Sequence, residues 1–221
     1  MKTRLTAWPR LATTSLAVAT LCAALQACAP IVVGAAVGTG VIVATDRRTS
    51  ATQLEDESIE LKASTRLVDR FAGSIRVSVT SFNRRVLLTG EVPSEAARAE
   101  ALRIVSGVEN VKEIVDEMAV MSSPSFTARQ GDTLTTGRVK AALVDADDLS
   151  VNAFKVVTER GTTYLMGRVT RREADRATEI TRSAPGVQRV VRVFEIITED
   201  ELRQLQFQPA PASDARVQPA R

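Results

Sequence analysis

Two segments of this chain have a residue suited to burial at every fourth position, apolar in each case except Thr135, and this spacing predicts two helices. The repeating positions are Ile59, Ala63 and Leu67 in the first segment, and Thr135, Val139 and Leu143 in the second. Residues four apart fall on one side of a helix, so each set forms an apolar stripe that can pack against a core. The second helix is expected at about residues 133–144.

Acidic residues stand where both helices are expected to begin. They are Glu55, Asp56 and Glu57 in the first segment and Asp132 in the second. Carboxylates are favourable near the positive end of a helix dipole, and Ser58 or Asp132 is expected to act as an N-cap. The cluster of three is therefore interpreted as helix-start charge rather than as an acid–base pair.

Alternating apolar positions follow each helix and predict strands. They are Ile75, Val77 and Val79 in the first case, and Phe154 and Val156 in the second. Asn83-Arg84 and Arg160-Gly161 are typical of tight turns, so each strand is expected to return as a hairpin through residues 86–88 and 164–166. A second helix (94–106 and 171–182) and a last strand (111–120 and 188–197) complete each set.

The two sets form an internal repeat. Val86-Leu-Leu-Thr-Gly-Glu-Val matches Thr163-Tyr-Leu-Met-Gly-Arg-Val, and Val108-Glu-Asn-Val matches Ala184-Pro-Gly-Val. Each copy reads helix, strand, strand, helix, strand. The order predicts an α+β fold, with a three-stranded mixed sheet covered by two helices in each copy. The copies are placed at residues 49–121 and 131–198, joined by a linker at 122–130.

The N-terminus has the layout of a secretory signal over residues 1–27. A basic start precedes residues 11–25, which are all apolar, Ser, Thr or Cys. The ending Leu25-Gln-Ala-Cys28 resembles a bacterial lipobox, which implies cleavage before Cys28 and lipidation of its thiol. An ordinary cleaved signal and an uncleaved anchor are the alternatives.

The ends of the mature chain are expected to lack a compact fold. Residues 31–44 are apolar but shorter than the roughly 20 residues of a membrane-spanning helix, so residues 28–48 are interpreted as a tether next to the lipid. The tail at 199–221 is rich in Pro, Ala, Gln and Arg and is expected to be mostly disordered. Residues 199–206 are a candidate helical extension.

Composition limits the functions that are open to the chain. The whole sequence has 29 Lys and Arg against 26 Asp and Glu. Without the three basic residues of the signal the balance is even, which removes the compositional support for nucleic-acid binding. Only Cys28 remains after cleavage, so no disulfide is expected. There is no histidine, and no catalytic residue, metal site or cofactor is predicted. The cluster Asp145, Asp147 and Asp148 is expected to be a solvated loop rather than a cation site.

Charge differs between the copies. Residues 49–121 hold 9 basic and 12 acidic residues, whereas residues 131–198 hold 11 basic and 9 acidic residues. Basic residues close to a bilayer attract anionic headgroups at about 1 kcal/mol each. The residues of interest in the second copy are Arg138, Lys140, Arg168, Arg171, Arg172, Arg176 and Arg182. An ordinary solvated polar face is the alternative reading.

The order of these motifs resembles the BON domain, with its Leu-x-Gly-x-Val and its later Gly-Val-x-x-Val. Two copies behind a lipobox resemble dual-BON outer-membrane lipoproteins of the DolP type, over roughly residues 44–197. The first copy departs from the pattern with Asn110 at the position of the loop glycine. Asn tolerates a left-handed backbone, so the fold is expected to survive this change.

The resemblance implies that the first helix of the second copy binds anionic phospholipid, such as phosphatidylglycerol or cardiolipin. Helical spacing then identifies the candidate binding face, opposite Val139. Its residues are Leu134, Gly137, Arg138, Ala141 and Val144. The alternative is that Leu134 and Val144 complete the core of their own domain.

The sequence thus predicts a non-enzymatic lipoprotein of the outer membrane that faces the periplasm and supports envelope integrity. Ala29 follows the cysteine, where an aspartate would resemble a signal for retention in the inner membrane. The competing hypothesis is a protein adaptor that binds an envelope assembly or cell-wall remodelling factor.

Overall fold

The computed structural model describes residues 46–121 and 126–207. The predictions for the signal, for lipidation at Cys28, for most of the tether and for residues 208–221 lie outside this part of the chain. Residues 46–207 belong to a single compact unit. The contacts reported below are internal to it, so a fragment that begins at residue 46 contains both partners of each of them.

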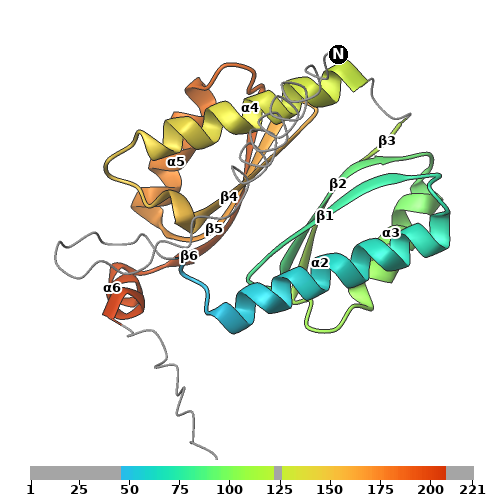
Figure 1. Cartoon of the computed structure of the whole chain (residues 1–221), viewed down its shortest axis with the longest axis horizontal. Helices are drawn as coiled ribbons and strands as arrows, with labels where there is room; N and C mark the ends of the chain where they lie inside the picture. Colours follow the sequence, from blue (N-terminus) through green and yellow to red (C-terminus); the bar gives the residue numbers. More distant parts are fainter. Residues whose placement is uncertain (1–45, 122–125, 208–221) are drawn as a thin grey trace, which may run out of the picture. The chain divides into compact units, whose positions relative to one another are not determined.

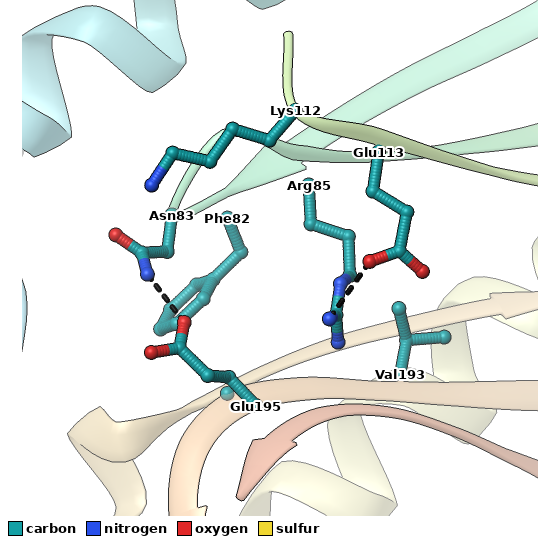
Figure 2. A pocket seen from close by; sticks show the side chains of 8 residues that line it. Phe82, Asn83, Arg85, Lys112, Glu113, Val193 and Glu195 are labelled. Atoms are coloured by element: carbon teal, nitrogen blue, oxygen red, sulfur yellow. Dashed lines mark hydrogen bonds and ion pairs between the residues drawn. The ribbon is translucent and has the colours of Figure 1, made fainter.

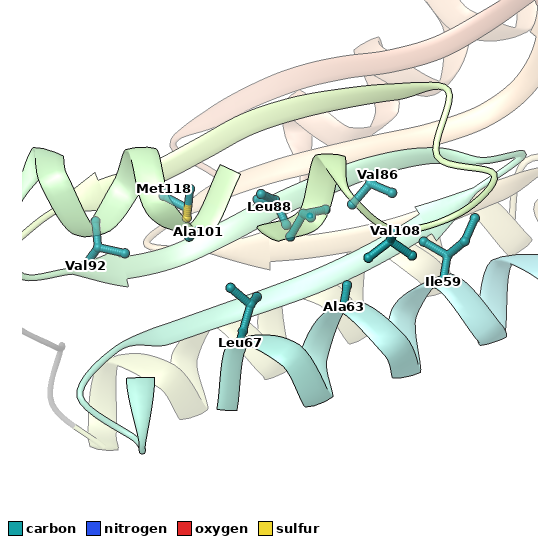
Figure 3. Close-up of a cluster of buried hydrophobic side chains, with 10 residues drawn as sticks. Ile59, Ala63, Leu67, Val86, Leu88, Val92, Ala101, Val108 and Met118 are labelled. Carbon is teal, nitrogen blue, oxygen red and sulfur yellow. The ribbon is translucent and has the colours of Figure 1, made fainter. Parts of the chain in front are cut away.

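The first module has the predicted order of elements (Figure 1). These are α2 (Ser50–Phe71), β1 (Arg76–Phe82), β2 (Arg85–Val92), α3 (Glu95–Ser106) and β3 (Glu113–Val120). The sheet order is β1-β2-β3, with β1 antiparallel and β3 parallel to β2. Both helices pack on one face of this mixed sheet, as Figure 3 shows for the core of the module.

The second module repeats this arrangement. Its elements are α4 (Phe126–Val144), the 3₁₀ turn η2 (Val151–Ala153), β4 (Phe154–Glu159), β5 (Thr162–Thr170), α5 (Arg171–Ser183) and β6 (Arg189–Ile197). Its sheet order is β4-β5-β6, again with one antiparallel and one parallel pair. The predicted α+β architecture is therefore confirmed in both copies. The predicted helical stripes are buried, with Ala63, Val139 and Leu143 fully enclosed.

The glycine of each Leu-x-Gly-x-Val motif is required because the backbone of a neighbouring segment passes too close to leave room for a side chain. A Cβ on Gly90 would lie 2.0 Å from the carbonyl oxygen of Arg76, and one on Gly167 would lie 2.3 Å from that of Ala153. The flanking Leu and Val residues of both motifs lie in the module cores. At the loop position, Asn110 adopts a left-handed backbone with φ of 67°, as expected.

The predicted helix starts were wrong. The first helix begins at Ser50 with Thr49 as its N-cap, and the second begins at Phe126, so it takes up part of the expected linker at 122–130. Neither Ser58 nor Asp132 caps a helix. The acidic residues that resembled start signals lie inside the helices, where Glu55, Asp56 and Asp132 make tertiary contacts instead of binding helix ends.

Asp56 and Asp132 occupy equivalent positions and bind the hairpin turn of their own module. Both oxygens of Asp56 accept hydrogen bonds, from the amides of Asn83 and Arg84 at 2.8 and 2.7 Å. Asp132 accepts from the amides of Arg160 and Gly161 at 2.8 and 2.9 Å. The two residues of each turn have positive φ and lie outside the strand pairing, so their N–H groups need other acceptors. One carboxylate satisfies both.

The sheet faces that carry no helices share a third apolar cluster. It contains Phe82, Leu87, Tyr164, Met166 and Val193, all buried, with Val115, Val157 and Val191 packed against them. Residues from β1 and β2 thus contact residues from β5 and β6. The two modules are therefore joined by a shared cluster of buried apolar side chains as well as by the linker.

Ion pairs with buried carboxylates also link the two modules. Glu91 is 1% exposed, and its carboxylate accepts from Nε of Arg76 at 2.8 Å and from Nη1 of Arg160 at 2.9 Å. Arg160 also donates to the carbonyl of Gly90, and Arg76 pairs with Glu159 of the other module. Each charge has a partner, which is the condition under which a charge can be buried without a large cost.

The last residues of the predicted tether are fixed rather than free. Arg47 makes a bidentate ion pair with Glu173 at 2.6 and 2.8 Å, and both side chains are almost fully buried. Arg48 pairs with Asp56 and lies 4.2 Å from the ring centroid of Phe82. The expected tail likewise begins with a helix, α6 (Glu199–Phe207), which buries Leu202.

Candidate functional site

Helix α4 has two distinct faces. Thr135, Val139 and Leu143 are buried against the second module. The opposite side carries the five residues predicted as the binding face, Leu134, Gly137, Arg138, Ala141 and Val144, and all five are exposed. Leu134 is 61% and Val144 is 62% exposed, so the alternative in which they complete their own core is wrong.

The exposed face of α4 has no acidic residue over 133–144, but it has Arg138 and Lys140. Arg138 donates to the carbonyl of Pro185 at 3.4 Å, a contact that leaves its charge uncompensated. Two large apolar side chains therefore flank a cationic centre on one accessible helix face. This combination is typical of helices that lie in a membrane interface.

The structure divides the seven basic residues of the second module into paired and unpaired groups. Arg168 pairs with Glu195, and both Arg172 and Arg176 pair with Asp148. Within residues 46–121 and 126–207, no ion pair or side-chain hydrogen bond is recorded for Lys140, Arg171 or Arg182. Acidic neighbours thus neutralise three of the seven basic residues, so fewer uncompensated charges remain than the sequence suggests.

The acidic cluster after α4 lies in a loop, as expected. Asp148 is engaged by the two arginines of α5, and Asp145 and Asp147 are exposed. Among the residues that the structure describes, no group of three or more His, Cys, Asp or Glu is placed to hold a metal ion.

A cleft of about 230 Å³ opens between the two modules (Figure 2). Its polar side chains pair mainly with each other: Arg85 with Glu113 at 2.8 Å, and Asn83 with Glu195. Arg85 also donates to the carbonyl of Phe194 at 2.8 Å. The contacts of Asn83 with Glu195 and of Arg85 with Phe194 join the modules, whereas the Arg85–Glu113 pair lies within the first one. None of these contacts places a nucleophile beside a base.

A second exposed apolar face lies on α2 of the first module, and the sequence analysis missed it. Leu54, Leu61 and Val68 are 67%, 70% and 64% exposed. They recur every seven residues on the side opposite the buried stripe. The seven-residue spacing of these three residues is visible in the sequence, but the four-residue spacing of the buried stripe alone does not reveal it.

The described part of the chain has no helix that is both long enough and apolar enough to cross a bilayer.

The BON domain family matches the chain twice, at residues 55–122 and 131–198. Each match covers most of one module of the structure. The outer membrane lipoprotein DolP of Haemophilus influenzae is 34% identical over 178 residues, which are 78% of this chain and 90% of that protein. The osmotically-inducible protein Y of Escherichia coli is 33% identical over 141 residues, which are 62% of this chain and 70% of that protein.

A solved structure of CdsD, a structural protein of the type III secretion system of Chlamydia trachomatis, aligns with 71% of this chain and 98% of that one. Its TM-score of 0.28 and identity of 14% are too low to bear on function. The two sequence relatives are informative. The family of DolP and of the osmotically-inducible protein Y (OsmY) consists of non-enzymatic proteins, and this chain is non-enzymatic as well. The chain belongs to the BON-domain family, and it carries two BON domains in tandem.

Proposed function

We propose that this protein is a lipid-anchored protein of the outer membrane, facing the periplasm, whose second BON domain binds anionic phospholipid and supports envelope integrity. The anchor is the thiol of Cys28. This part of the proposal is supported by the signal layout and by similarity to a protein named as an outer membrane lipoprotein.

The observation that carries the lipid-binding proposal is the exposure of Leu134 and Val144 on either side of Arg138. Their helix is already anchored by its other face, so these apolar groups are free to enter a headgroup layer. Burying a Leu or Val side chain is favourable by about 1.5–3 kcal/mol. Arg138 and Lys140 add attraction to anionic lipid.

The anchor and the second domain have different roles in this proposal. A bacterial lipoprotein anchor with two or more acyl chains holds a protein stably on a membrane. The second domain is then not needed for attachment, and its weak contact selects where the protein lies by favouring anionic lipid. The tether raises the local concentration and so makes a weak contact effective.

Vesicle flotation of a fragment from residue 46 to residue 221 tests the lipid-binding role without the anchor. We expect it to float with phosphatidylglycerol or cardiolipin vesicles and not with phosphatidylcholine vesicles. Leu134→Glu and Val144→Glu should each weaken binding by about tenfold or more, because each places a charge on an apolar contact.

Leu54→Glu is the matched control, because Leu54 is an equally exposed leucine on the corresponding helix of the first domain. Circular dichroism should show all three variants folded. Equal binding to neutral and anionic vesicles, or equal loss in Leu54→Glu and Leu134→Glu, would contradict the proposal.

The apolar face of α2 favours a second candidate function, a protein adaptor in the envelope. Exposed apolar side chains along one helix face form a ridge against which another helix can pack. The partner on this reading is a helix of an envelope protein. Leu61→Glu in the full-length protein should abolish cross-links made from α2 in cells while leaving vesicle binding unchanged, and Leu134→Glu should do the reverse.

A further inference from the structure

We propose that the second BON domain holds a site for the phosphate group of an anionic lipid in the loop between α5 and β6, with Arg182 as its principal ligand. The inference rests on the proposed lipid binding and names where the headgroup is recognised. The apolar face of α4 and this loop then have separate roles. The face of α4 enters the membrane interface, and the loop binds the headgroup.

The loop contains a pocket of about 310 Å³. Its walls are formed by Arg182, Val187, Gln188, Arg189 and Val190. The two valines are half-buried and pack against the core of the domain, so the floor of the pocket is rigid. A pocket of this size is within the range of small-ligand sites and can accept a phosphate ester with a short polyol.

The loop lies directly against α4. Gly186 has φ of 99°, and a Cβ at this position would lie 2.3 Å from Oγ1 of Thr135. Next to it, Arg138 donates to the carbonyl of Pro185. The pocket therefore belongs to a loop that packs on the helix that carries the exposed Leu134.

The charge around the pocket is positive and partly uncompensated. Residues 180–194 contain three arginines and no acidic residue. Arg192 pairs with Asp175, and Arg189 is held by Glu117 at 3.0 Å. Arg182 is exposed, and no ion pair or hydrogen bond of its side chain to another described residue is recorded. It is thus the guanidinium that is available to an incoming anion.

Phosphate is the chemistry that this arrangement fits. A guanidinium presents a planar fork of donors that binds two phosphate oxygens at once, which an ammonium group does not do. Gln188 adds a polar group that suits a glycerol hydroxyl, and the valines accept the carbon chain. The ligand class is a phosphate ester, which can come from a membrane lipid or from free solution, and we assign the membrane lipid.

The test compares Arg182→Gln with Arg171→Gln in the 46–221 fragment. Both residues are exposed arginines of α5, each substitution removes one charge, and about 16 Å of helix separates them. With phosphatidylglycerol vesicles, Arg182→Gln should weaken binding by about tenfold or more. Arg171→Gln should weaken it by less than about twofold, because salt screens charges at this distance from the pocket. Arg182→Lys should restore binding only in part.

Two further titrations, followed by NMR at the amides of Val187 and Gln188, identify the source of the phosphate. We expect soluble glycerophosphoglycerol to shift these amides in the wild type and not in Arg182→Gln, and inorganic phosphate to bind at least about tenfold more weakly. Equal binding of inorganic phosphate would overturn the lipid assignment. Equal effects of the two α5 substitutions on vesicle binding would overturn the site while leaving the proposed function intact. Failure of the wild type to bind any anionic vesicle would instead remove the proposed function.

Discussion

At the scale of single residues, an aspartate at the equivalent position of each module has the same role. Asp56 and Asp132 each satisfy two turn amides of their own hairpin. Asp56 does more, because it also accepts from Oγ of Ser81 at 2.7 Å and from Arg48 at 2.7 Å. Helix, hairpin and incoming chain therefore meet at a single buried side chain.

The pKa of Asp56 is lowered by this environment. Burial by itself raises the pKa, but hydrogen bonds from Ser81, from the amide of Arg84 and from Arg48 outweigh it. A carboxyl group with a lowered pKa in the folded state contributes stability above its unfolded pKa of about 3.9. This contribution is lost as the pH falls through the folded pKa.

We therefore expect Asp56→Asn to lower the free energy of unfolding by about 2–4 kcal/mol at pH 7, because it leaves Arg48 and the turn amides poorly satisfied. The difference in unfolding free energy between the variant and the wild type should shrink below about pH 4, where protonation of Asp56 begins to remove its stabilising contribution. Urea unfolding of the 46–221 fragment at pH 7 and pH 3 measures both values. Asp145→Asn, at an exposed carboxylate, should have little effect at either pH. If Asp56→Asn lowered the unfolding free energy by the same amount at both pH values, the stability would not depend on the ionisation of Asp56.

At the scale of the elements, the two first helices present different outer faces on the same architecture. Val68 of α2 and Val144 of α4 are both exposed and occupy equivalent positions, whereas Leu61 corresponds to Gly137 and Lys62 to Arg138. The first domain thus offers an apolar stripe, and the second offers a mixed apolar and cationic face. The vesicle and cross-linking experiments above separate these faces because each variant changes one helix only.

The exposed face of α4 was predictable from the sequence, whereas the start of α4 was not. Once Val139 and Leu143 are placed inward, helical geometry sends Leu134, Ala141 and Val144 outward. The prediction of Asp132 as an N-cap was wrong, because an aspartate just before an apolar stripe is also the usual sequence pattern of a helix N-cap. Its actual partners, the amides at Arg160 and Gly161, are 28 and 29 residues away in sequence.

At the scale of the whole molecule, the two domains share a core as well as a chain. Along β2, Leu87 and Leu88 are both fully buried, but Leu87 lies in the cluster shared by the domains and Leu88 in the core of the first domain. Adjacent residues of a strand point to opposite faces. The interface can therefore be weakened at one residue and the domain core at the next.

We expect the wild-type fragment to unfold in one calorimetric transition. Leu87→Ala should cost about 2–5 kcal/mol, as a truncation in a packed core does, and should split the transition because the loss falls on the interface. Leu88→Ala should cost a similar amount and lower the transition temperature without splitting it. A single shifted transition for both variants would mean that the interface does not control cooperativity.

The sequence by itself determined the local and repeated parts of this protein: two α+β modules, their strands and turns, and the outward face of α4. These follow from periodicity, from turn residues and from a glycine that has no room for a side chain. Only the tertiary structure decided how the modules join, where Asp56, Asp132 and Arg47 find their partners, and which arginines stay unpaired beside the α5–β6 loop. Those features depend on residues brought together from distant parts of the chain, and hydrophobic spacing within one segment carries no information about such partners.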